Sequence, residues 1–178
     1  MINIISRILL GSATLIMGVS AANAAKDDPY AKSMKIELPQ NTHPIYLGGG
    51  LTKELMHGTA VKPTEYGNFY AKVGQFYDGD GVAAQAGYRY PVALSGKNNN
   101  GVYLGGFAGH VEAEKDEGEL KNRLGGGLDV SYLWFDASRI SSLSVGVYMG
   151  EVFKDDLGVD RTEKVQAMFS LNLSGGFF

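Results

Sequence analysis

Cysteine is absent from this chain of 178 residues, and tryptophan and proline are scarce, with one and five residues. Without cysteine there is no disulfide framework, Cys-ligated zinc, thiol nucleophile or acylated lipoprotein anchor. A mean hydropathy of -0.08 excludes a bundle of membrane-spanning helices. The length allows one domain and at most a small second one.

Glycine and tyrosine, in contrast, are abundant. The chain holds 25 Gly, 10 Tyr and 8 Phe, and glycine occurs at about twice its usual share. These counts favour a glycine-rich, tyrosine-rich β protein and name neither a reaction nor a cofactor. The formal charge of -3 disfavours a nucleic-acid partner, which requires a basic surface.

The first 24 residues have the pattern of a secretory signal peptide. One basic residue, Arg7, precedes the uncharged and mostly apolar stretch 8–18, which is too short to span a bilayer, since that takes about 20 residues. Ala22 and Ala24 then supply the small side chains that signal peptidase recognises, so we expect cleavage after Ala24. The expected organisation is a signal peptide (1–24), a flexible mature N-terminus (25–32) and one folded domain (33–178).

Beyond residue 33, apolar residues alternate with polar or small ones, as β-strands require. In the clearest segment, Val165, Phe169 and Leu173 share one face, while Ser170 and Asn172 share the other. Six segments are well defined and two are weaker, 45–53 and 33–38. Eight is an even number, which closes an antiparallel up-and-down barrel with both chain ends on one side. The six clear segments are 68–77, 82–90, 103–114, 123–134, 142–150 and 165–177.

The composition of the polar face predicts which face points inward. It mixes Gly and Ser with single charged residues, as in the interior of a narrow membrane barrel, where opposite charges neutralise one another. The alternative is a soluble, lipocalin-like barrel with its apolar face inward. The expected interior polar network is Lys72, Gln85, Arg89, His110, Glu112, Arg123 and Asp129. Aromatic residues near segment ends suit a lipid–water boundary: Tyr66, Tyr77, Tyr90, Tyr103, Trp134, Phe135, Phe153, Phe177 and Phe178.

The signal sequence, the alternating segments and the C-terminal run LNLSGGFF (171–178) resemble those of small Gram-negative outer-membrane β-barrel proteins of the OmpA-domain or OmpX type. The resemblance implies an all-β, eight-stranded transmembrane barrel. It also implies that Phe177 and Phe178 form a sorting signal for the barrel-assembly machinery. By alternation, Phe177 lies on the apolar face of its predicted strand, and Phe178 lies on the opposite face.

The resemblance further implies periplasmic chain ends and external loops at 40–44, 78–81, 114–122 and 154–163. Two of these, 114–122 and 154–163, are the most highly charged stretches after the signal peptide. The turn at 136–139 is short, as a periplasmic turn should be. Segment 55–64 is expected to connect two strands on the periplasmic side.

One predicted strand carries residues that could support chemistry. Its alternation places His110, Glu112 and Glu114 on one face and Tyr103, Phe107 and Val111 on the other. The polar trio could be a general base with carboxylate support or a pair of metal ligands. The favoured interpretation is that it pairs with Lys72, Arg89 or Arg123 across the interior, so we predict no metal site and no cofactor.

Serine residues on the polar face of the predicted strand 142–150 raise the possibility of a catalytic triad. Ser142 or Ser144 with His110 and Glu112 supply the residue types of a Ser–His–Glu triad, and some outer-membrane barrels of this size are lipid A deacylases or acyltransferases. No local motif around these serines resembles theirs. The catalytic candidates are therefore His110, Glu112 and Ser144, without a predicted reaction.

The sequence thus predicts an integral protein of the bacterial outer membrane, exported through the periplasm, with a non-enzymatic structural or surface-interaction role through charged external loops. Expected partners are outer-membrane lipid and lipopolysaccharide, and the barrel-assembly machinery during biogenesis. The alternatives are a lipid-modifying enzyme, a small pore and a soluble periplasmic ligand-binding barrel. The ligand of the loops is not predicted.

Overall fold

The computed structural model describes residue 38 and residues 42–77, 81–95, 99–116, 119–152 and 165–177. The predicted signal peptide, with Ala22 and Ala24, and the expected mature N-terminus at 25–32 lie outside the described residues. None of the helices in the described residues is both long and apolar enough to cross a membrane.

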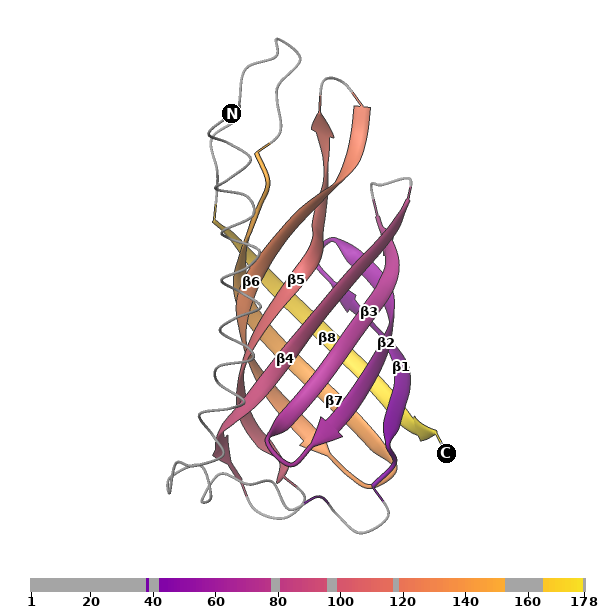
Figure 1. Ribbon diagram of the computed structural model, residues 1–178, viewed down its shortest axis with the longest axis vertical. Helices are drawn as coiled ribbons and strands as arrows, with labels where there is room; N and C mark the ends of the chain where they lie inside the picture. The colour runs from indigo at the N-terminus through magenta and orange to yellow at the C-terminus, as the bar shows by residue number, and fades with distance from the viewer. Residues whose placement is uncertain are drawn as a thin grey trace. The chain divides into compact units, whose positions relative to one another are not determined.

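Eight antiparallel strands form a closed barrel in which each strand pairs with the next and the last returns to the first (Figure 1). This confirms the predicted all-β, eight-stranded antiparallel architecture. Closure leaves no unpaired outer edge, because β8 pairs along the whole of β1. The strands are β1 (Ile45–Thr52), β2 (Leu55–Thr64), β3 (Gly67–Phe76), β4 (Val82–Leu94), β5 (Gly101–Asp116), β6 (Glu119–Phe135), β7 (Arg139–Gly150) and β8 (Gln166–Phe177).

The predicted number of strands is right, but one predicted member is wrong. Segment 55–64 is strand β2 and not a long connection. The expected strand at 33–38 has no place, because β1 already pairs with β2 on one side and β8 on the other; Leu38 is not in a strand, and 33–37 lie outside the described residues.

The barrel has two ends that differ in their connections. The terminal end holds the start of β1 and the end of β8, with the connections 65–66, 95–100 and 136–138; it lies at the bottom of Figure 1. The loop end holds 53–54, 77–81, 117–118 and 151–165. The stretch 40–44 was expected among the external loops, but Pro44 immediately precedes β1 at the terminal end, and residues 40–41 lie outside the described residues.

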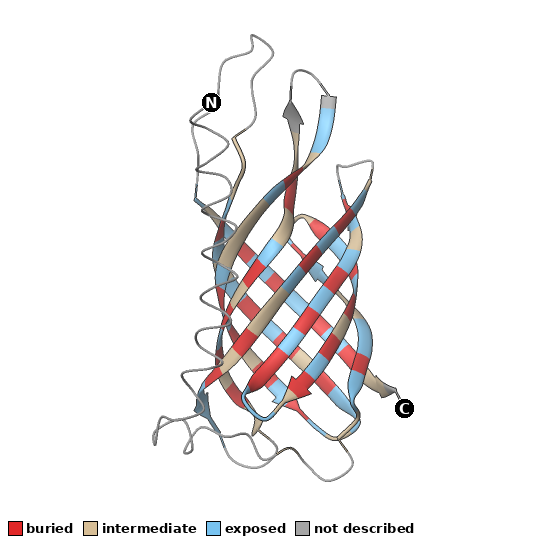
Figure 2. Cartoon of the chain, in the orientation of Figure 1, coloured by how far each residue is buried: buried red, intermediate tan, exposed pale blue. Residues whose placement is uncertain are grey.

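Side chains alternate between a buried inner face and an exposed outer face along the strands (Figure 2). In β8, Phe169, Leu171 and Leu173 are exposed, whereas Ser170 and Asn172 are buried. The same assignment of faces is confirmed for β3, β4, β6 and β7. The outer face is therefore apolar and the inner face largely polar.

Strand β5 departs from the prediction. Tyr103, Phe107 and Val111 are buried inside, and Leu104 is exposed instead. Phe107 pairs with Gly87 on one side and Gly127 on the other. A Cβ at Gly127 would approach the Phe107 ring to 2.6 Å. The interior thus has room for the Phe107 ring because Gly127, which faces it, has no side chain. The prediction that the aromatic residues of β5 point outward is therefore wrong.

Aromatic and aliphatic side chains close the interior at the terminal end. The rings of Tyr46 and Phe135 lie 5.9 Å apart, and the Tyr46 hydroxyl donates to the carbonyl oxygen of Ala137 at 2.8 Å. Tyr103 and Phe135 therefore belong to this plug, and the prediction that they lie in an aromatic belt on the outer face is wrong. Phe153, Phe178 and the side chain of Phe177 lie outside the described part. The plug comprises Tyr46, Val61, Tyr103, Leu133, Phe135 and Ile140.

Candidate functional site

Six charged side chains of the described strands lie inside the barrel, in two groups at different levels, whereas others such as Lys62 and Arg139 are exposed. Lys72, Gln85, Arg89, Glu112, Arg123 and Asp129 are all buried. Gln85 donates to the main-chain oxygen of His110 at 2.7 Å and belongs to neither group. His110, the seventh residue of the predicted interior network, is only partly buried and also belongs to neither group.

Arg89 and Asp129 form the ion pair at the centre of the barrel. Arg89, from β4, reaches the Asp129 carboxylate on β6 through Nε at 3.2 Å and Nη2 at 3.0 Å. Its Nη1 and Nη2 also donate to the hydroxyls of Ser142 and Ser144 on β7. The Ser131 hydroxyl donates to the Asp129 carboxylate at 3.0 Å and lies 2.9 Å from the Ser144 hydroxyl. The side chains are 4% and 0% exposed, so hydroxyl groups take the place of water around this pair.

Lys72 extends the same network to the opposite wall. Its Nζ donates to the Ser170 hydroxyl on β8 at 3.1 Å. Asn172 joins Ser170 to Ser142 through its amide, and its oxygen accepts from Thr59. The Tyr70 ring lies under both cations, with its centroid 4.3 Å from the Arg89 guanidinium carbon. We call this set the central network: His57, Thr59, Lys72, Arg89, Asp129, Ser131, Ser142, Ser144, Ser170 and Asn172.

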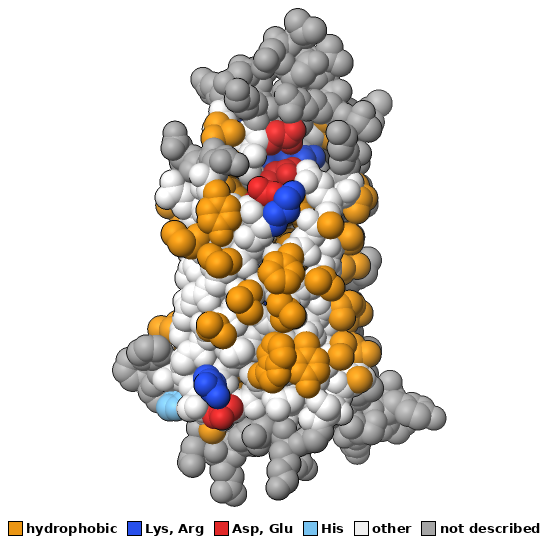
Figure 3. All heavy atoms as spheres, turned by 180° about the vertical axis from the view of Figure 1, so that it is seen from behind, with side chains coloured by type: hydrophobic (Ala, Val, Ile, Leu, Met, Phe, Trp, Pro, Cys, Tyr) orange, Lys and Arg blue, Asp and Glu red, His pale blue; other side chains and the backbone are white. Residues whose placement is uncertain are grey.

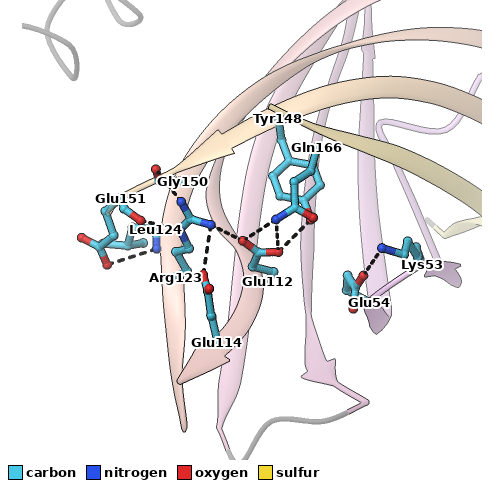
Figure 4. Close-up of polar contacts among 10 residues, drawn as sticks. All are labelled: Lys53, Glu54, Glu112, Glu114, Arg123, Leu124, Tyr148, Gly150, Glu151 and Gln166. Atoms are coloured by element: carbon cyan, nitrogen blue, oxygen red, sulfur yellow. Dashed lines mark hydrogen bonds and ion pairs between the residues drawn. The ribbon is translucent and has the colours of Figure 1, made fainter. Parts of the chain in front are cut away.

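The second group lies nearer the loop end (Figure 4) and is called the Glu112 cluster: Glu112, Glu114, Arg123, Tyr148 and Gln166. Arg123 pairs with both carboxylates, reaching Glu114 at 3.1 Å. It also donates to the carbonyl oxygens of Gly150 and Glu151. Glu112 further accepts from the Tyr148 hydroxyl and the Gln166 amide. The cluster thus joins β5, β6, β7 and β8.

Together the two groups balance in charge. The central network carries two cations and one anion, and the Glu112 cluster carries one cation and two anions. The two groups together hold three cations and three anions, which lowers the electrostatic cost of keeping charge inside the barrel. The arrangement fills and braces the interior by joining opposite walls.

His110 points away from Glu112, contrary to the prediction that they share a face. A bulge lies between them: His110 pairs with Leu124, which is exposed, whereas Glu112 pairs with Arg123, which is buried. The extra residue shifts the alternation by one. His110 Nδ1 accepts the Ala84 amide proton at 3.0 Å.

The predicted triad residues are therefore not assembled. Ser144 pairs with Ser131 on β6, and Ser131 pairs with Tyr103 on β5. His110 lies seven residues beyond Tyr103 on β5, which is about 23 Å at roughly 3.3 Å per residue. Ser144 instead contacts Arg89 and Ser131. Within the part of the chain that is described, no group of three or more metal-binding side chains occurs either.

Several members of the two groups were not singled out from the sequence. His57 was assigned to a loop but lies in β2, where it bonds with Thr59 at 2.9 Å. Ser170 and Asn172 lie on the polar face of a correctly assigned strand, and this alternation was the sequence feature that could have identified them. Tyr148 and Gln166 also occupy polar-face positions of correctly assigned strands, but their contacts with Glu112 depend on the pairing register of the strands, which the sequence did not predict.

The outer wall of the barrel contrasts with this interior. Its exposed large apolar side chains come from all eight strands. On the face seen in Figure 3, hydrophobic side chains lie between charged side chains toward either end. Examples from successive strands are Leu47, Met56, Phe69, Val82, Leu104, Leu128, Val145 and Leu173. Compared with models of protein families, with curated proteins and with solved structures, the chain matches none of them.

Proposed function

We propose that the chain is an integral protein of the bacterial outer membrane, with a non-enzymatic structural or surface-interaction role carried by its loop end. The observation that carries this proposal is the apolar outer wall. Soluble monomers rarely expose contiguous apolar patches of more than a few hundred Å², whereas a membrane barrel needs an apolar band around its full circumference. Closure of the sheet also satisfies every strand edge, as hydrocarbon requires.

Aromatic side chains on the outer wall near the terminal end support the same proposal. Phe69 contacts Tyr88 with ring centroids 4.6 Å apart, and Tyr132 contacts Trp134 at 4.7 Å. Tyrosine and tryptophan prefer the level of lipid headgroups. This girdle therefore suits the membrane boundary at the terminal end.

The connections support an orientation with the loop end outside the cell. Bacterial outer-membrane barrels have short periplasmic turns and longer external loops. The longest connection, 151–165, is at the loop end, which also holds the short connections 53–54 and 117–118. At the terminal end the connections 65–66, 95–100 and 136–138 span at most six residues. On this proposal, the segments before and after the barrel keep their predicted roles as a cleaved signal and a sorting signal.

The alternatives fit the described interior less well. A pore needs an open lumen, but Lys72 and Arg89 cross the interior to bind residues of β8 and β7. A Ser–His–Glu hydrolase needs His110 beside a serine, and the bulge directs it elsewhere. A carrier of apolar ligands needs an apolar cavity, whereas the middle of this interior is hydrogen-bonded.

Fractionation of cells that express the full chain tests the proposal. We expect the protein in the outer-membrane fraction, extracted only by detergent, with a folded form whose electrophoretic mobility changes on boiling. Recovery in the soluble periplasmic extract would contradict the proposal.

A pair of matched variants tests the lipid contact itself. Val145 and Val165 are similarly exposed, at 57% and 63%, but Val145 lies in the middle of β7 and Val165 just before β8. Arginine at the bilayer midplane costs about 2–4 kcal/mol and near the interface about 0–1 kcal/mol. We therefore expect Val145→Arg to lower the free energy of unfolding in lipid vesicles far more than Val165→Arg. Equal losses would indicate an outer wall in water.

A further inference from the structure

A surface pocket of about 430 Å³ lies at the terminal end of the barrel, beside the turn between β6 and β7. It is lined by Asn100, Trp134, Phe135, Asp136, Arg139 and Ser141. Trp134 and Ser141 are paired neighbours on the outer wall. The pocket thus combines an exposed aromatic ring, Trp134, with one cation and one carboxylate, beside the buried ring of Phe135.

The tight turn fixes the two opposite charges next to one another. Asp136 and Arg139 exchange backbone hydrogen bonds of 2.9 and 3.2 Å. One oxygen of the Asp136 carboxylate accepts from the Ser138 amide and hydroxyl. These hydrogen bonds lower the pKa of Asp136, so the carboxylate is charged at neutral pH.

Arg139 is exposed. Among the described residues, no salt bridge includes its guanidinium. Its partner on β8 is Gly175, where an added Cβ would meet nothing within 4 Å. The wall beside the guanidinium is therefore open on that side.

The surroundings place the pocket between headgroup and hydrocarbon levels. The Trp134 ring, 46% exposed, packs on Tyr132, and such rings prefer the membrane interface. Further from the terminal end, Leu143 pairs with Tyr132 and Leu173 pairs with Ser141, and both leucines are exposed. An acyl chain could continue from the pocket over these two leucines.

We propose that this pocket binds the zwitterionic phosphoethanolamine headgroup of a glycerophospholipid, with Arg139 on the phosphate and Asp136 on the ammonium. The proposal rests on the membrane location proposed above. A guanidinium is suited to phosphate oxygens. A primary ammonium donates three hydrogen bonds, of which the second Asp136 oxygen can accept one. A headgroup that carries only a phosphate would have no ammonium to pair with Asp136, and its negative charge would be repelled by the carboxylate.

The only tryptophan of the chain provides a direct readout. The full-length protein is reconstituted in vesicles of equal parts phosphatidylethanolamine and phosphatidylglycerol, with brominated acyl chains on one lipid at a time. Bromine on an acyl chain quenches a tryptophan that it contacts, so the ratio of Trp134 quenching by the two labelled lipids reports which lipid is enriched beside the pocket. Exposed ion pairs are weak, so we expect phosphatidylethanolamine to be enriched about two- to fivefold beside Trp134.

Charge-removing variants identify the contacts. Asp136→Asn keeps an oxygen that can accept from Ser138, so the turn is retained while the charge is lost; we expect the preference to reverse toward phosphatidylglycerol. Arg139→Gln should abolish enrichment of both lipids. Lys62→Gln is the matched control, because it removes a cation from the exposed face of β2 near the same end, and should leave the preference unchanged.

The outcomes separate this proposal from the previous one. Equal quenching by the two labelled lipids, or a preference unchanged in Arg139→Gln, would overturn the headgroup site while leaving the barrel in the membrane. Brominated phosphatidylcholine, tested in the same way, should give less enrichment, since its quaternary ammonium has no N–H group, and equal enrichment would overturn the ammonium contact. No quenching by any lipid would contradict the membrane location itself.

Discussion

The two charged groups inside the barrel use the same chemistry at different depths. In the central network, the Arg89 and Asp129 side chains are 4% and 0% exposed, and serine hydroxyls surround them. In the Glu112 cluster, Glu112 is 10% and Glu114 28% exposed, and Arg123 also binds main-chain carbonyls. The difference predicts that the loss of stability from equivalent substitutions follows the order of burial, because water can replace a lost partner more easily where the side chain is more exposed.

The largest loss is expected from Asp129→Asn. This change keeps the shape of the side chain and an oxygen that can accept from Ser131, but leaves the Arg89 guanidinium buried without a counter-ion. Removing one partner of a buried pair costs about 3–5 kcal/mol. Urea unfolding in detergent micelles, followed by electrophoretic mobility without boiling, measures the loss. A cost below that of the substitutions in the Glu112 cluster would contradict the comparison.

An intermediate loss is expected from Glu112→Gln. Glu112 accepts from Arg123, Tyr148 and Gln166, and the amide cannot accept all of these bonds, since half of it donates. Arg123 keeps Glu114 and the carbonyl oxygens, so no cation is stranded. A cost of about 1–3 kcal/mol follows for an unsatisfied buried group. Tyr148→Phe, which leaves both charges in place, is the control and should cost less in the same assay.

The sequence predicted the fold through period-two alternation wherever that alternation was regular. Lys72, Arg89 and Asp129 were assigned to one interior because each has apolar neighbours on both sides along its strand. The pairing of Arg89 with Asp129 could not be predicted, since it depends on the register that places β4 and β6 on either side of β5.

The errors have physical causes in particular residues. In β2, Met56, Gly58 and Ala60 face outward while His57 and Thr59 face inward, so hydropathy marks neither face strongly. Its flanking connections, 53–54 and 65–66, contain no glycine, proline or asparagine to signal a turn. In β5, the bulge before Glu112 moves His110 to the other face, and a bulge leaves no mark in the pattern of residue types.

The smallest loss is expected from Glu114→Gln, which sharpens the comparison most. Glu114 is the most exposed of the three interior carboxylates, and exposed pairs are worth about 0.2–1 kcal/mol. Its contribution should also fall with added salt, whereas that of Asp129 should not, because salt screens charges that water reaches. Unfolding of the three amide variants at low and high ionic strength measures both effects. A salt-dependent cost at Asp129 equal to that at Glu114 would mean that water reaches the centre of the barrel, and the lumen would then have to be treated as open.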